Sequence, residues 1–151
     1  MKLRIAALLA GLWAGIVLCV AALAAPSAFA TLATPDAGRL VGRLFMQEAY
    51  LSLGLAIVLF AIERQRSQAA AASGGGSVFG ANLVILLGTL FCTVAGYFAL
   101  QPMMEAARAG QGRLSFMTLH LISAGLFVLK GLLVLALAWR LAAASSAAKT
   151  S

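Results

Sequence analysis

The chain has 151 residues, of which 63% are hydrophobic and 10% charged, and its formal net charge is +7. Ordinary soluble domains carry about 25% charged residues, so this composition excludes a water-soluble core and favours an integral membrane protein. At about 20 residues per span, the length accommodates four helices and excludes a separate soluble catalytic domain. The basic residues are scattered at the ends of apolar segments, which favours contact with the lipid bilayer and excludes nucleic acid as a partner.

The first apolar run covers residues 5–25 and follows Lys2 and Arg4. A basic start and the Ala28-Phe29-Ala30 box are typical of a secretory signal, but signal cores have about 7–15 apolar residues and this run is longer. We therefore expect it to be retained as the first span, with cleavage as the alternative. Pro26 removes a backbone donor and is expected to kink or end this helix.

The second helix is predicted to begin at Thr34-Pro35-Asp36, where Thr caps, Pro fits the first turn and Asp favours the positive end of the helix dipole. Its membrane-spanning part is expected at residues 44–62, interrupted by Gln47 and Glu48. Residues 67–77 are rich in Ala, Gly and Ser and predict a flexible cytoplasmic linker.

The third span is expected at residues 79–100 and is interrupted by Gln101-Pro102. The fourth is expected at residues 115–139, and residues 142–151 are predicted to be a disordered tail. Residues 1–141 would then form a single all-α domain, a four-helix bundle in the membrane.

Small residues recur every four positions in the first three spans. Such strips let neighbouring helices approach closely, so we expect them to carry the packing of the bundle. The glycines concerned are Gly11, Gly15, Gly38, Gly42, Gly88 and Gly96.

The orientation follows from the basic residues. An inside amino terminus places six on the cytoplasmic side and four on the other, which predicts that both termini lie in the cytoplasm. The six are Lys2, Arg4, Arg64, Arg66, Arg140 and Lys149, and the four are Arg39, Arg43, Arg108 and Arg113.

Two ionisable residues lie at a similar predicted depth near the outer side. Glu48 follows Arg43 by five residues and His120 follows Arg113 by seven, which is about 7.5 and 10.5 Å along each helix. We expect a Glu48–His120 hydrogen bond there, in a polar layer that Ser123 and Gln101 complete. The layer is either a site for a proton, metal ion or small polar ligand, or a buried pair that only fixes helix packing.

Other candidate chemistry is sparse. His120 and Met117 are weak candidate ligands for a soft metal, but a single histidine is too few for a site, so no metal or other cofactor is predicted. Cys19 and Cys92 lie in separate apolar runs with no metal-binding spacing. No nucleophile has a base at triad spacing, which argues against an enzyme. Lys130 is expected to extend its ammonium to the cytoplasmic interface, with a buried charge facing the bundle as the alternative.

The sequence resembles the transmembrane protein 205-like family, whose bacterial members carry a domain of unknown function. The resemblance rests on Pro26-x-x-Phe29, on the 37–45 segment AGRLVGRLF, on Pro102 with Arg108, and on Phe116-x-x-Leu119-His120-x-x-Ser123. It implies a four-helix integral membrane protein with Gly38, Gly42, His120 and Ser123 as signature positions, and Lys130 departs from its pattern.

The leading functional interpretation is a non-enzymatic partner in membrane assembly or trafficking, acting on another membrane protein or as a homo-oligomer. The alternative is a small transporter or a protein that handles protons or metal ions through the Glu48/His120 layer.

Overall fold

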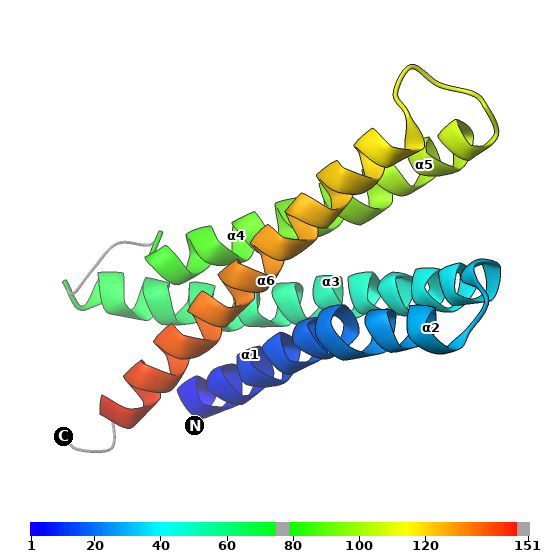
Figure 1. Cartoon of the computed structure of the whole chain (residues 1–151). Coiled ribbons are helices and arrows are strands. Elements are labelled where there is room, and N and C mark those ends of the chain that lie inside the picture. Colours follow the sequence, from blue (N-terminus) through cyan, green and yellow to red (C-terminus); the bar gives the residue numbers. More distant parts are fainter. Residues whose placement is uncertain (75–78, 148–151) are drawn as a thin grey trace.

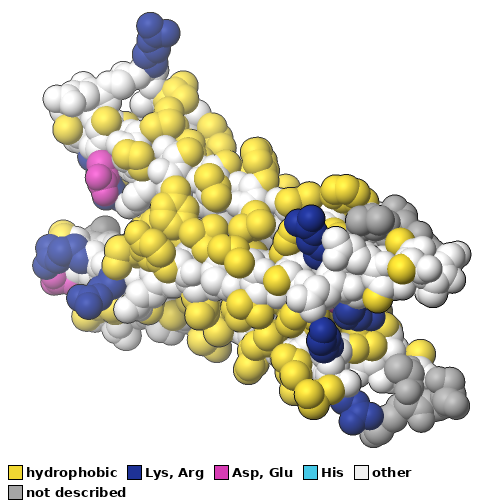
Figure 2. Space-filling view, turned by 180° about the vertical axis from the view of Figure 1, so that it is seen from behind, with side chains coloured by type: hydrophobic (Ala, Val, Ile, Leu, Met, Phe, Trp, Pro, Cys, Tyr) yellow, Lys and Arg dark blue, Asp and Glu magenta, His cyan; other side chains and the backbone are white. Residues whose placement is uncertain are grey.

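The computed structural model describes residues 1–74 and 79–147, and within these ranges every regular element is a helix (Figure 1). Four helices are long and apolar enough to cross a membrane, at Lys2–Thr31, Thr34–Ala72, Ala81–Arg108 and Phe116–Ala147. This confirms the all-α, four-helix membrane fold that the apolar runs predict. The apolar middle and the Lys and Arg side chains toward both ends are visible in Figure 2.

Two of the four spans are bent and built from three segments each. The first comprises α1 (Lys2–Cys19), the π-helical η1 (Val20–Ala24) and α2 (Ala25–Thr31), and the third comprises α4 (Ala81–Thr93), the π-helical η2 (Val94–Ala99) and α5 (Leu100–Arg108). A proline follows each π segment within three residues, at Pro26 and Pro102. Because proline lacks an N–H and crowds the preceding turn, a wider π turn lets the helix continue past it.

The other two spans are uninterrupted, α3 (Thr34–Ala72) and α6 (Phe116–Ala147). Both helices extend beyond the ends predicted from the sequence. Residues 67–72 are the last turns of α3, and residues 142–147 are the last turns of α6. The expected linker and disordered tail are therefore wrong over these residues, because their alanines favour a helix already nucleated upstream. Residues 75–77 of the expected linker and 148–151 of the tail lie outside the described residues.

Each bent span forms a helical hairpin with the straight span that follows it: α2 turns back into α3, and α5 into α6 (Figure 1). The start of α1, the end of α3, the start of α4 and the end of α6 lie at one end of the molecule, called here the terminal end. The two hairpin turns lie at the other, called the turn end.

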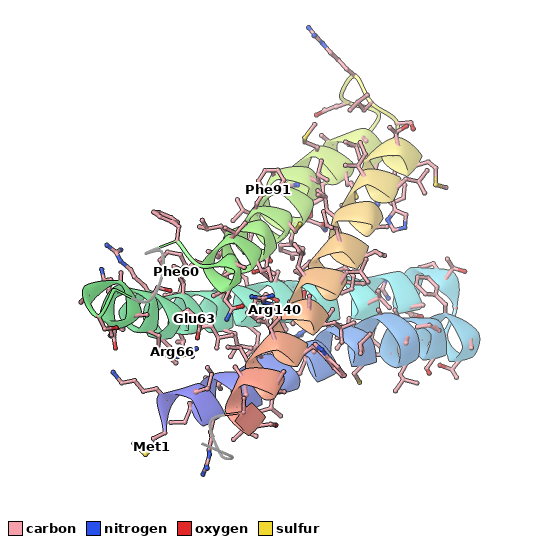
Figure 3. The ribbon with its side chains drawn as sticks, turned by 90° about the vertical axis from the view of Figure 1, so that its left-hand side faces the viewer. Met1, Phe60, Glu63, Arg66, Phe91 and Arg140 are labelled. Carbon is pink, nitrogen blue, oxygen red and sulfur yellow. The ribbon has the colours of Figure 1, made fainter. Side chains whose placement is uncertain are left out.

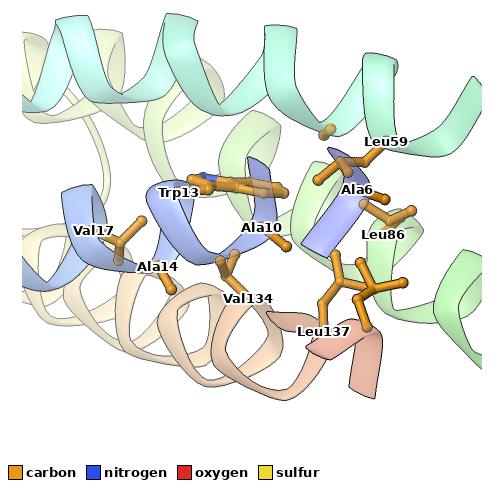
Figure 4. Close-up of a cluster of buried hydrophobic side chains, with 11 residues drawn as sticks. Ala6, Ala10, Trp13, Ala14, Val17, Leu59, Leu86, Val134 and Leu137 are labelled. Carbon is orange, nitrogen blue, oxygen red and sulfur yellow. The ribbon is translucent and has the colours of Figure 1, made fainter. Parts of the chain in front are cut away.

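The main core lies toward the terminal end, where α1 packs against α6 and α3 against α4. Trp13 lies at its centre, among Ala10 of α1, Leu59 of α3 and Val134 of α6 (Figure 4). Toward the turn end, by contrast, the two hairpins diverge (Figure 1). There α2 packs on its own partner α3, through a small cluster of Ala28, Ala37 and Val41. The fold is thus closed at one end and splayed at the other.

Candidate functional site

A buried ion pair joins the two hairpins where they begin to diverge. Lys130 Nζ of α6 donates to Glu48 Oε2 of α3 at 2.6 Å. Each residue is only 3% exposed, although both lie in membrane-spanning helices. Glu48 comes fourteen residues after the start of α3, and Lys130 fourteen after the start of α6. At 1.5 Å per residue, both lie about 21 Å along their helices and therefore at the same level of the bundle.

The second oxygen of Glu48 is held by a chain of hydrogen bonds that reaches α1. Ser52 Oγ, one turn further along α3, donates to Glu48 Oε1 at 2.5 Å. The same hydroxyl accepts a hydrogen bond from Trp13 Nε1 of α1 at 2.8 Å. The bonds therefore run from Trp13 through Ser52 and Glu48 to Lys130 and connect three helices.

Aromatic rings enclose the lysine side of the pair. The Lys130 ammonium lies 4.6 Å from the centroid of the Phe127 ring on its own helix. Phe127 in turn meets Phe45 of α3 edge to face, with ring centroids 4.9 Å apart. A cation–π contact is stronger when the cation is removed from water, so Phe127 both shields and stabilises the ammonium.

The network is complete within the described part of the chain. No buried side-chain nitrogen or oxygen there lacks a hydrogen-bond partner. An unpaired charge at the centre of a span costs about 2.5–3.5 kcal/mol or more, so each member of the pair makes the other tolerable. Removing one partner leaves a buried uncompensated charge, which costs about 3–5 kcal/mol in buried pairs.

The expected Glu48–His120 hydrogen bond is not made. His120 is exposed on α6 and stacks on Phe116, one turn earlier, with centroids 5.8 Å apart. Ser123 Oγ donates instead to the backbone oxygen of Gly96 at 2.7 Å, which links α6 to η2. Gln101 is half-buried in the first turn of α5, and no hydrogen bond from its side chain to Glu48, His120 or Ser123 occurs. The predicted layer is therefore not one site.

The expectation that Lys130 reaches the interface is also wrong, and the alternative of a charge facing the bundle holds. The sequence contained a usable signal: Glu48 and Lys130 have opposite charges and equal distances from the starts of their helices. The depth of Glu48 measured from Arg43 was wrong because Arg43 lies in the third turn of α3, whereas the helix begins at Thr34. Trp13 and Ser52 had no comparable signal, since both are ordinary in apolar helices.

The small-residue strips divide into two groups. A Cβ built on Gly96 would lie 3.1 Å from Leu126 Cβ, and one on Gly88 would lie 3.1 Å from Leu133 Cδ1, so both glycines pack against α6. The other four strip glycines are exposed and a Cβ on them would meet nothing within 4 Å, so they do not pack this bundle as expected. They are Gly11, Gly15, Gly38 and Gly42.

A second polar cluster joins three helices at the terminal end. Asn82 of α4 donates to Glu63 Oε2 of α3 at 2.9 Å and accepts from Arg140 Nε of α6 at 2.8 Å. Glu63 also pairs with Arg66, one turn along α3. Figure 3 shows Glu63, Arg66 and Arg140 at this end of the ribbon. The cluster therefore links α3, α4 and α6 at the closed end of the bundle.

Metal-binding residues are not gathered together. Among residues 1–74 and 79–147, no group of three or more His, Cys, Asp and Glu side chains is placed to hold an ion. Met117 is exposed on α6. The two free cysteines lie on different spans, Cys19 exposed and Cys92 buried.

Comparison with known proteins gives one match. No curated protein and no solved structure matches the chain. A protein family described as a domain of unknown function, DUF4149, matches residues 8–113. The match includes α3 with Glu48 and ends before α6, which carries Lys130. Since it covers more than half of the sequence, the chain belongs to the DUF4149 family.

Proposed function

We propose that this protein is a non-enzymatic membrane assembly partner, which binds a transmembrane helix of another membrane protein between its diverging hairpins. The observation that carries the proposal is a pair of helix faces at the turn end. They are the α3 stripe, made of Gly38, Gly42 and Phe45, and the α6 stripe, made of His120, Ala124 and Phe127.

Residues three and four apart share a helix face, so the three residues of each stripe lie on one face of their helix. Phe45 and Phe127 are in contact, so the stripes face each other and separate toward the turn end (Figure 1). Beyond these rings the remaining four residues are all exposed, and nothing lies within 4 Å of a Cβ built on Gly38 or Gly42. Exposed glycines four apart are the surface that a close helix–helix contact in a membrane requires.

The chemistry of the chain supports a binding role over catalysis. Glu48 and Lys130 are used to satisfy each other, and Ser52 is held between Trp13 and Glu48. A catalytic nucleophile needs a nearby base and room for a substrate, whereas these groups are buried and fully bonded.

Site-specific photo-cross-linking in cells tests the proposal. A photoreactive residue at Gly42 should yield a discrete cross-linked protein, and one at Gly54 should not. Gly54 is the matched control because it is also exposed with open space around it, but lies on the opposite side of α3 from Phe45. Gly38→Leu should abolish the cross-link. Equal labelling at Gly42 and Gly54, by lipid alone, would refute the proposal.

We also propose the bacterial inner membrane as the location, with both termini in the cytoplasm, and a relationship to the transmembrane protein 205-like family. In support of the orientation, basic residues from three spans lie at the terminal end, namely Lys2 of α1, Arg66 of α3 and Arg140 of α6. Lys2 Nζ donates to Gln65 Oε1 at 2.9 Å, and Arg140 bonds Asn82. Such a basic end is retained on the cytoplasmic side.

A second candidate function is proton or ion handling, which the buried Glu48–Lys130 pair favours. An ionisable pair inside a span at the junction of two hairpins is where transporters place coupling sites. Proton flux into liposomes that contain the purified protein tests it. Flux that disappears in a folded Glu48→Gln variant would support this candidate, and no flux from the folded wild type would exclude it.

A further inference from the structure

The two hairpins repeat the same order of elements. Each has an α-helix, a π segment, a proline within three residues, a short α-helix, a turn and a long straight helix. The first hairpin spans Lys2–Ala72 and the second spans Ala81–Ala147. The two also run in the same direction, since each starts at the terminal end (Figure 1).

The straight helices correspond at a fixed separation of 82 residues. This is the separation of Glu48 from Lys130, and also of Phe45 from Phe127. At this separation Leu44-Phe45 aligns with Leu126-Phe127. Five further apolar residues align with identical residues: Leu51, Leu53, Leu55, Ala56 and Leu59 correspond to Leu133, Leu135, Leu137, Ala138 and Leu141. Four of the five residues buried in α6 have an equivalent buried in α3, namely Leu119, Lys130, Val134 and Leu141.

The bent helices correspond at a separation of 76 residues, which aligns Pro26 with Pro102. The burial patterns agree in this register too. The buried residues Ala10, Trp13, Val17, Val20 and Ala28 fall on the buried residues Leu86, Thr89, Thr93, Gly96 and Met104. The larger separation of the straight helices reflects the longer second turn, residues 109–115 against 32–33, together with one additional residue at the end of α5.

The contacts between the halves have the pattern of a two-fold axis. The contact of α1 with α6 corresponds to the contact of α4 with α3, and both are made. Under two-fold symmetry a residue meets its own equivalent only at the axis. Phe45 meets Phe127 there, and Glu48 meets Lys130.

We infer that the chain is a fused pair of equivalent hairpins related by a pseudo-two-fold axis along the membrane normal, and that the axial Glu48–Lys130 pair makes each half bind the unlike half. If two copies paired their like halves, the same position would hold two carboxylates or two ammonium groups. Like charges buried together in hydrocarbon are strongly unfavourable, whereas the unlike pair satisfies both. Each hairpin therefore buries equivalent positions in the interface, and the charge at the axis decides which half it binds.

The test uses two full-length variants with different affinity tags, Glu48→Lys and Lys130→Glu, expressed together. Each variant alone carries like charges at the axis. Together they restore unlike pairs by exchanging hairpins between the two chains, as in a domain-swapped dimer. We expect the two tagged variants to co-purify at least about tenfold more than two tagged wild-type chains. Co-purification equal to that of the wild-type pair would overturn the inference.

A double variant, Glu48→Lys with Lys130→Glu in one chain, provides a second test if the single variants are degraded. Because the two positions are equivalent, the exchanged pair lies on the same axis, and most of the folded monomer seen by size-exclusion chromatography should return. A double variant no better folded than either single variant would overturn the inference. Neither result depends on whether a partner binds the α3 and α6 stripes, so this test and that of the proposed function are separate.

Discussion

The indole N–H of Trp13 donates to the hydroxyl of Ser52 across the interface between α1 and α3. That hydroxyl has a single proton, which it directs to Glu48. Trp13 of α1 therefore fixes the direction of a bond that supports the buried carboxylate of α3, which Lys130 of α6 neutralises. The core and the ion pair are consequently one unit.

Ser52→Ala should lower the free energy of unfolding by about 1–3 kcal/mol, because it leaves both the indole N–H and one carboxylate oxygen without a partner. Unfolding by SDS in mixed micelles measures this loss. Ser146→Ala is the control, since its exposed hydroxyl bonds only the backbone of its own helix, at Ala142. Equal midpoints for the two variants would show that the chain of bonds carries no stability.

Glycine-to-alanine substitutions should separate by position. At Gly96 the new Cβ meets Leu126 Cβ, an atom that moves only with its backbone, so we expect a loss of about 1–3 kcal/mol. At Gly88 it meets Leu133 Cδ1, the end of a flexible side chain, so the loss should be smaller. At Gly54 there is open space, and alanine should stabilise the helix by up to about 1 kcal/mol.

The same SDS titration ranks the three variants. An identical effect at Gly96 and Gly54 would contradict the close approach of η2 to α6.

His120→Ala should change the free energy of unfolding by less than about 0.5 kcal/mol, because the ring is exposed and stacks on Phe116 of its own helix. Glu48→Gln should be far more damaging in the same assay. A large loss for His120→Ala would show that this residue has a partner the monomer does not supply, such as a helix bound at the α6 stripe.

The architecture was predictable because it depends on length and hydropathy. Four apolar runs long enough to span a bilayer require four helices, and those helices are found. What composition does not specify is where a helix stops. Pro26 and Pro102 do not end their spans, because a π segment precedes each of them and the helix continues. The alanines near residue 70 extend α3.

The ion pair was less accessible to prediction for a geometric reason. Depth estimated from the nearest arginine placed Glu48 with His120, whereas depth from the helix starts places it with Lys130. The ion pair also depends on which face of each helix is turned toward the bundle. Hydropathy does not determine that face when most residues on every face are apolar. His120 faces outward and Lys130 inward, although both interrupt the same apolar run.

A double-mutant cycle on Glu48 and Lys130 tests most directly whether a buried ion pair joins the two hairpins. Unfolding of Glu48→Gln, Lys130→Met and the double variant would be measured by SDS titration in mixed micelles. We expect each single variant to lose about 3–5 kcal/mol, and the double variant to lose clearly less than the sum, since no charge is then left unpaired. Strictly additive losses would contradict a direct bond between these residues and with it the account of how the two hairpins are held together.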